Sequence, residues 1–187
     1  MKPRISILLA LLVLGAGMFV YMEAGYLPRQ AAQQERYRAE QLDPLTHHLD
    51  EVLPYRHLYM GNAGNLTQLF GHLPLQDLAF TFQLYPDELT AVLRFESAAT
   101  DTAQLHLQRS LIYNSTAAIA LIGNLEVIRY QFTDVNYEIS RSDIGEQYGA
   151  ISTLLDPAAW RTSVQEPLRD PDYVQDVWDA RFTEVAS

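Results

Sequence analysis

The sequence predicts an α+β domain behind an N-terminal membrane helix, and three observations lead to this prediction. Residues 5–22 contain no charged side chain. Residues 78–84 with 89–95, and 127–133 with 137–141, have the alternation and turn residues of two β-hairpins. Helical patterns separate and follow these hairpins. We therefore expect a small antiparallel sheet of two hairpins packed on helices.

The uncharged N-terminal segment spans roughly 27 Å as a helix, close to the thickness of a bilayer core. Lys2 and Arg4 precede it, which predicts a cytoplasmic N-terminus and an exported remainder. Its one small-residue cleavage motif, at residues 15–17, lies inside the apolar run. We expect residues 1–25 to be a single-pass anchor in the cytoplasmic membrane with the C-terminal domain outside. Secretion after signal cleavage is the alternative.

Residues 26–43 are rich in Gln, Glu and Arg and are expected to form a helical or loosely ordered stalk. The extracytoplasmic domain then covers residues 44–187. Asp43 and Pro44 have the pattern of a helix start, and the leucine spacing predicts a helix that Pro54 ends. A second helix is expected over residues 63–72, capped by Asn62.

The longest helix of the domain is predicted over residues 102–122, and its C-terminal end, residues 117–122, is apolar on all sides, which indicates burial. Gly123 and Asn124 have the composition of a C-cap. Helices are further expected from Ser142 to Leu155, from Pro157 onward, and over residues 172–182.

The charge of the exported part restricts its partners. From Glu23 onward the chain has eleven arginines, no lysine and twenty-three acidic residues, a net charge of −12. Nucleic acids and anionic lipid headgroups are repelled by such a surface, so no nucleic-acid partner is expected. The chain has no cysteine, so its stability must come from a core rather than from disulfides.

No catalytic residue is predicted, because the sequence has no Gly-x-Ser-x-Gly elbow, no Ser-x-x-Lys and no thiol. His47 and His48 lie near Asp50 and Glu51, but the spacing matches no metal motif. We expect these histidines on a solvated helix face, and we expect neither a metal ion nor another cofactor.

Three arginines are the candidate ligand-binding residues. Arg109, Arg129 and Arg141 fall in the long helix and in the second hairpin. Their planar guanidinium groups could bind a carboxylate or a phosphate if two of them converge. The other interpretation is that each pairs with an acidic neighbour at the surface.

Three segments together resemble a known family: YMGN and LFGHLPL at residues 59–62 and 69–75, YNSTAAIALIGN at 113–124, and YEISR at 137–141. This order is similar to the bacterial domain of unknown function 4825, over about residues 55–155. The resemblance implies a membrane-anchored extracytoplasmic domain with no established activity. In some relatives a similar domain accompanies membrane-embedded regulators, which suggests sensing. Arg141, Asn114 and Asn124 match the family pattern, and Asn114 joins the three arginines as a candidate ligand-binding residue. Helix capping or core hydrogen bonds would explain the two asparagines as readily as a ligand.

These observations favour a tethered protein-interaction or sensor module, held in the membrane by its N-terminal helix and partnered by an envelope or membrane protein. The alternative is a small envelope ligand-binding protein or enzyme with a cleft near Arg109 and Arg141. A structural component of an envelope complex is the third hypothesis.

Overall fold

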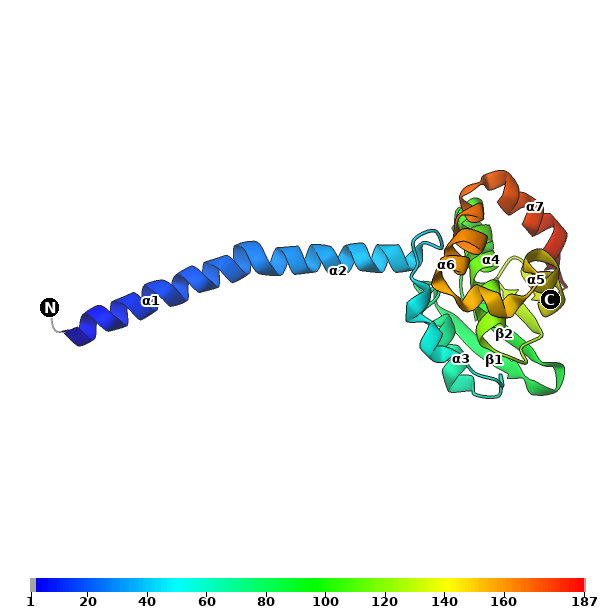
Figure 1. Ribbon diagram of the computed structural model, residues 1–187, viewed down its shortest axis with the longest axis horizontal. Coiled ribbons are helices and arrows are strands. Elements are labelled where there is room, and N and C mark those ends of the chain that lie inside the picture. Colours follow the sequence, from blue (N-terminus) through cyan, green and yellow to red (C-terminus); the bar gives the residue numbers. More distant parts are fainter. Residues whose placement is uncertain (1–2, 187) are drawn as a thin grey trace. The chain divides into compact units, whose positions relative to one another are not determined.

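The computed structural model describes the backbone of residues 3–186 and the side chains of residues 11–186, in two compact units, Met1–Ala39 and Glu40–Ser187 (Figure 1). Lys2 and the side chain of Arg4, on which the predicted orientation depends, lie outside these ranges. We describe each unit by itself.

Consecutive helical segments make up the first unit and lead into the second. They are α1 (Pro3–Tyr21), a π-helical turn (Met22–Tyr26) and α2 (Leu27–Leu42). The apolar side chains from Leu11 to Leu14 are all at least 61% exposed. Within the residues whose side chains are described, one helical stretch, Leu11–Leu42, is long and apolar enough to cross a membrane. Such a segment fits a membrane anchor or a signal sequence.

The helix predicted after Asp43 does not form, and that prediction is wrong. Asp43 makes a single turn, in which its carbonyl oxygen accepts hydrogen bonds from the amides of Thr46 and His47. The backbone at His48 is then extended, and only two short 3-10 turns follow, Leu49–Glu51 and Leu53–Tyr55. Burial of the His47 side chain, described below, requires this break.

Two helices of the domain form as predicted. Helix α3 (Ala63–Phe70) begins at Asn62, whose side-chain oxygen accepts a hydrogen bond from the amide of Asn65. Helix α4 (Gln104–Leu121) is buried along most of its length. Gly123 does not cap α4 in a left-handed conformation. Among the described glycines only Gly149 has a positive φ, which a left-handed cap requires. That expectation is wrong, and Gly123 has a different role at the site.

Both predicted hairpins are present in one mixed sheet of order β1-β2-β3-β4-β5. Strands β1 (Phe80–Tyr85) and β2 (Thr90–Phe95) form the first hairpin, and β3 (Val127–Gln131) and β4 (Asn136–Ser140) form the second. The two hairpins join through a parallel pairing of β2 with β3. A parallel pair needs a long crossover, which α4 supplies. The short strand β5 (Thr183–Glu184) was not predicted and pairs with β4.

Among the C-terminal helices, the one predicted over residues 172–182 forms within one residue of its expected bounds, as α7 (Pro171–Arg181). The expected helix from Ser142 to Leu155 is interrupted: α5 (Arg141–Tyr148) ends at Gly149, with φ of 72°, and a 3-10 helix follows (Ile151–Leu155). Helix α6 (Pro157–Trp160) starts at the predicted proline. It continues as a π-helical turn (Arg161–Gln165) and a 3-10 turn (Pro167–Arg169).

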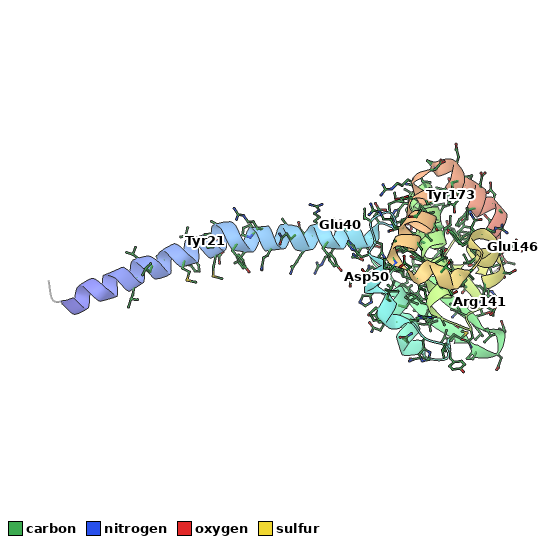
Figure 2. All side chains as sticks on the ribbon, viewed as in Figure 1. Tyr21, Glu40, Asp50, Arg141, Glu146 and Tyr173 are labelled. Atoms are coloured by element: carbon green, nitrogen blue, oxygen red, sulfur yellow. The ribbon has the colours of Figure 1, made fainter. Side chains whose placement is uncertain are left out.

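Helix α7 (Pro171–Arg181) is the last helix, and polar contacts tie it to α5. Arg181 pairs with Glu146, and the side-chain amide of Gln147 donates to the hydroxyl of Tyr173 at 3.1 Å. Figure 2 shows Glu146 and Tyr173 on these two neighbouring helices.

The core lies between the sheet and the helices, with α4 at its centre. On one face of the sheet, side chains such as Leu93, Ile128 and Tyr130 are buried, and the Tyr130 hydroxyl lies 2.9 Å from that of Ser115 on α4. The far side of α4 contacts the C-terminal helices, which bury Trp160, Val164 and Val174. The result is the predicted α+β architecture, with helices on one face of the sheet.

Candidate functional site

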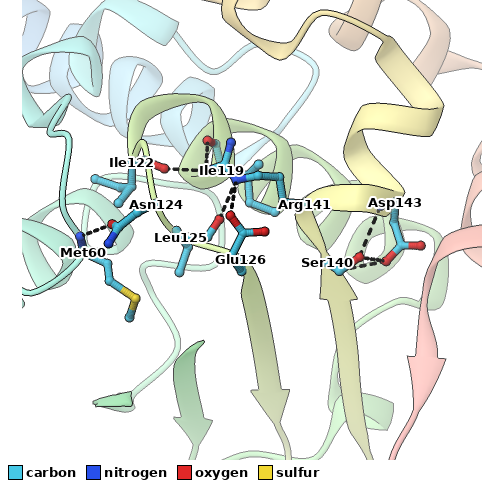
Figure 3. A network of polar contacts seen from close by, with 9 residues as sticks. All are labelled: Met60, Ile119, Ile122, Asn124, Leu125, Glu126, Ser140, Arg141 and Asp143. Carbon is cyan, nitrogen blue, oxygen red and sulfur yellow. Dashed lines mark hydrogen bonds and ion pairs between the residues drawn. The ribbon is translucent and has the colours of Figure 1, made fainter. Parts of the chain in front are cut away.

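The candidate site lies at the C-terminal end of α4, where Arg141 closes the helix. The guanidinium of Arg141 donates from Nη2 to the carbonyl oxygens of Ile119 at 3.0 Å and Ile122 at 2.6 Å. Its Nε donates to the carbonyl oxygen of Leu125 at 2.9 Å (Figure 3). Helix ends leave carbonyl groups without partners and carry partial negative charge. A guanidinium at this position therefore provides hydrogen-bond donors for the carbonyl groups and a positive charge beside the negative helix end.

Local sequence places Arg141 at this point. Strand β4 ends at Ser140, and Ser140 and Asp143 form a reciprocal capping box that starts α5 (Figure 3). The amide of Arg141 donates to the carbonyl oxygen of Glu126 at 2.7 Å. The side chain thus leaves the sheet in the direction of the α4 terminus.

The charge of Arg141 is paired with the carboxylate of Glu126. Burial lowers the pKa of the guanidinium, and the carboxylate of Glu126, 3.3 Å from Nε, partly offsets this effect. Glu126 is 47% exposed in its side chain, whereas Arg141 is 23% exposed. Because arginine stays protonated in proteins, Arg141 and Glu126 form a partly buried ion pair at the site.

A pocket of about 440 Å³ opens beside Arg141. Arg56 and His57 also line it, together with apolar residues that include Leu58, Ile151 and Leu155. None of its described lining residues is acidic. Arg56 is exposed, and no described acidic residue forms an ion pair with it. The pocket is thus lined by two arginines, of which Arg141 pairs with Glu126 and Arg56 has no acidic partner among the described residues.

The segment that carries Arg56 and His57 is fixed to the end of α4 by backbone hydrogen bonds. The amide of His57 donates to the carbonyl oxygen of Leu121 at 3.0 Å, and the amide of Gly123 donates to the carbonyl oxygen of His57 at 2.9 Å. A Cβ atom on Gly123 would lie 2.9 Å from the carbonyl oxygen of Leu58. The glycine is therefore needed for close approach of two backbones.

Asn124 completes this attachment. Its side-chain oxygen accepts a hydrogen bond of 2.6 Å from the amide of Met60 (Figure 3). The Gly123-Asn124 pair thus holds the pocket wall in place.

The structure does not bring the three predicted arginines together. Nε and Nη2 of Arg109 donate to the carbonyl oxygens of Leu168 and Arg169 at 2.7 and 3.0 Å. Ten residues of helix, or about 15 Å, separate Arg109 from the carbonyl of Ile119 that Arg141 binds. Arg129 pairs with Glu138 and lies 3.9 Å from Glu88. A cleft shared by Arg109 and Arg141 is not formed, and Arg141 lines the pocket described above.

Asn114 is buried, and its amide nitrogen donates to the carbonyl oxygen of Pro74 at 2.6 Å. This bond joins α4 to the loop after α3. The prediction of a ligand role for Asn114 remains untested, but its contacts lie inside the core.

His47 is buried rather than solvated, which corrects the expectation for this residue. Its Nε2 lies 2.7 Å from the carbonyl oxygen of His72, and its Nδ1 lies 2.8 Å from the hydroxyl of Tyr113. Because a carbonyl can only accept, Nε2 carries the proton and Nδ1 accepts from Tyr113. Burial lowers the pKa of His47 to about 4 and raises that of Tyr113. Both groups are therefore neutral near pH 7.

Among the described residues, no group of three or more His, Cys, Asp or Glu side chains has the geometry to hold a metal ion.

Comparison with known families agrees with the resemblance seen in the sequence. Residues 52–142 match the family described as a domain of unknown function (DUF4825). The matched residues, just under half of the chain, are similar to DUF4825. No curated protein and no solved structure matches the chain significantly.

The DUF4825 match includes Arg56, His57 and Arg141, but not the whole folded unit. Helices α5 to α7 lie almost entirely beyond residue 142, yet they bury Trp160, Val164 and Val174 against α4. The pocket wall formed by Ile151 and Leu155 also lies outside the match. Residues 52–142 thus contribute the charged part of the pocket, and the residues after 142 contribute part of its apolar wall.

Proposed function

We propose that this chain is a membrane-tethered, extracytoplasmic interaction module that binds an anionic group of a partner protein at the Arg56–His57–Arg141 pocket. The observation that supports the proposal is the placement of two arginines and a histidine around one pocket in an otherwise acidic domain. A carboxylate or a phosphate is the group that guanidinium groups recognise; Arg56 would offer its fork to such a group, because Nε and Nη2 of Arg141 already bond to carbonyl oxygens.

The rim of the pocket offers apolar surface next to the charges. Leu58 is 72% exposed and Tyr59 is 65% exposed, and the two are adjacent in the segment that carries Arg56. Exposed aromatic and arginine side chains are typical of residues that dominate binding at protein interfaces. The combination suits a protein partner that presents an acidic side chain beside an apolar one.

The N-terminal helix supports the tethering part of the proposal. Its exposed apolar side chains have the length and composition of a membrane span. The stalk sequence is helical as far as Leu42, and the folded unit begins at Glu40. A module attached in this way stays at the membrane surface, where a membrane or envelope partner can reach it.

A small anionic ligand is the second candidate occupant, because the pocket volume falls within the range of small-molecule sites. Both candidates use the same chemistry, a carboxylate or phosphate at the arginines. With a small anionic ligand as the occupant, the module would act as a ligand sensor rather than as a docking domain.

Site-specific photocrosslinking distinguishes the two occupants. A photoreactive benzoylphenylalanine replaces Leu58 in the full-length chain in its native membranes. We expect a discrete protein adduct that disappears when Arg56→Glu is added and persists with Arg161→Glu. Arg161 is a matched control, because it is exposed and lies elsewhere in the domain.

A second variant carries benzoylphenylalanine in place of Ala180, an exposed residue on α7. It identifies adducts that form only because another protein is nearby in the membrane. The same adduct from both positions, or an adduct that ignores Arg56→Glu, would contradict a specific interaction at the pocket. Absence of any protein adduct, together with anion binding at the pocket, would favour the small-ligand function.

A further inference from the structure

The edge strand β1 is unprotected, and this feature is independent of the pocket. It occupies one end of the sheet order and pairs with β2 over six consecutive residues, without a bulge. Its sequence, FTFQLY, contains neither a charged residue nor a proline. Proteins normally protect an exposed edge by charge, proline, a bulge or shortness of the strand. The opposite edge shows such protection, because β5 has two residues and one of them is Glu184.

The hydrogen-bond pattern identifies the free backbone groups of β1. The amide of Glu96 donates to the carbonyl oxygen of Ala79 at 3.1 Å. Hydrogen-bonded pairs alternate along an antiparallel ladder, so Thr81 and Gln83 bond to β2. The N–H and C=O groups of Phe80, Phe82 and Leu84 therefore point away from β2, toward the open edge of the sheet.

The side chains of these residues are held on the core face. The rings of Phe80 and Phe95 lie 5.7 Å apart, and those of Phe82 and Phe70 lie 5.6 Å apart, measured between centroids. Phe80, Phe82 and Leu84 are nevertheless only partly buried. A strand added beside β1 would place alternate apolar side chains against them and extend the core.

The acidic residues at the two ends of β1 favour a basic segment over a second copy of the chain as the occupant of the edge. Asp77 and Asp87 are exposed on either side of β1, and no described basic residue pairs with either of them. A second copy paired antiparallel about the centre of β1 would bring Asp77 of one chain close to Asp87 of the other. Such like-charge contacts between two acidic domains are unfavourable. A segment with basic residues at both ends would meet opposite charges.

We propose that β1 is a strand-addition site for an extended segment of another protein, with alternating apolar residues flanked by Lys or Arg. Backbone hydrogen bonds to Phe80, Phe82 and Leu84 supply the pairing, and Asp77 and Asp87 position the basic ends. The site does not depend on the function proposed for the pocket, because none of its residues lines that pocket.

The test uses the full-length chain in nanodiscs of zwitterionic phosphatidylcholine and a synthetic peptide of alternating Thr and Val flanked by lysines. We expect the peptide to slow amide exchange of Phe82 and Leu84 at least about tenfold, whereas Thr81 and Gln83, already bonded to β2, change little. A peptide with glutamates in place of the lysines, or with a central proline, leaves all four amides unchanged.

Charge reversal tests the acidic ends. The double variant Asp77→Lys/Asp87→Lys is expected to prefer the glutamate peptide, and the control Asp172→Lys/Asp176→Lys on α7, with the same change in net charge, keeps the original preference. Exchange that stays fast with the lysine peptide would overturn the proposal. The proposal would also be overturned if, without peptide, the Phe82 amide exchanged more slowly as the protein concentration rose. That result would assign the edge to a second copy of the chain.

Discussion

Arg141 and Ile122 form the shortest of the three contacts that close helix α4, with 2.6 Å between the Nη2 atom of the arginine and the carbonyl oxygen. The same guanidinium lines the pocket that we propose as the binding site. Arg141 therefore has two roles. It holds the end of the central helix, and it supplies part of the positive charge that faces an occupant.

The first prediction concerns the stability supplied by Arg141. Arg141→Ala leaves carbonyl groups of Ile119, Ile122 and Leu125 without their donor, and we expect a loss of about 2–4 kcal/mol in the free energy of unfolding. Arg129→Ala removes a surface ion pair with Glu138 and should cost about 0–1 kcal/mol. Urea denaturation of both variants measures the difference. Equal losses for the two variants would contradict the role of Arg141 at α4.

The second prediction concerns Gly123. Gly123→Ala places a Cβ atom against the Leu58 carbonyl, so we expect destabilisation of about 1–3 kcal/mol and displacement of the segment with Arg56. Gly145→Ala is the matched control, because nothing lies within 4 Å of its Cβ position in α5; it should be neutral or stabilising by up to about 1 kcal/mol. Thermal unfolding distinguishes them, and a neutral Gly123→Ala would show that close approach is not required.

The third prediction is a dependence of stability on pH through His47. The pKa of this residue is about 4 in the folded protein, against 6.5 for its ordinary value. The unfolded chain therefore binds more protons between these values. The contribution of neutral His47 to the free energy of unfolding is therefore complete above pH 6.5. It decreases by about 3 kcal/mol as the pH falls to 4.

Denaturation midpoints of the unchanged protein and of His47→Gln across this pH range measure the effect. We expect His47→Gln to be less stable near pH 7 and to have a flatter pH profile. Parallel profiles for the two proteins would assign the pH dependence to other groups.

The fourth prediction concerns topology, and the absence of native cysteine makes it simple to test. A single cysteine at the exposed position Ser142 should react with a membrane-impermeant maleimide in intact cells. A cysteine in place of Lys2 should react only after lysis. Labelling of Ser142→Cys only after lysis would place the domain in the cytoplasm, and a mature chain that lacks the apolar segment would indicate a cleaved signal.

Local sequence patterns predicted much of this fold. The alternation at residues 78–84 and 89–95 predicted the first hairpin, because burial on one face leaves a periodic signal. The apolar run near Ile119 predicted the buried helix, because a helix that is apolar on all sides is enclosed by the core. The parallel pairing of β2 with β3 was not predicted, since strand order depends on packing that no local pattern encodes. His47 was misassigned for the same reason. Its partners, Tyr113 and the carbonyl of His72, are distant in sequence.

The candidate site was predicted only in part. Arg141 was selected by its residue type, but Arg56 and His57 were not, because they lie in an irregular segment without a motif. The relevant signal was the Gly123-Asn124 pair, which was interpreted as a helix cap. A glycine directly after a buried helix can also indicate the close approach of another backbone, and at Gly123 that backbone belongs to the segment that carries Arg56 and His57.

Anion binding at the pocket tests the proposed function most directly. The full-length chain in zwitterionic nanodiscs is titrated with inorganic phosphate and with N-acetylglycine at constant ionic strength, and the amide chemical shifts of Leu58 and Gly123 are followed by NMR. We expect saturable shifts at both amides that are lost in Arg56→Glu and retained in Arg161→Glu. Shifts that do not saturate, or that are equal in the two variants, would contradict recognition of an anionic group at this pocket.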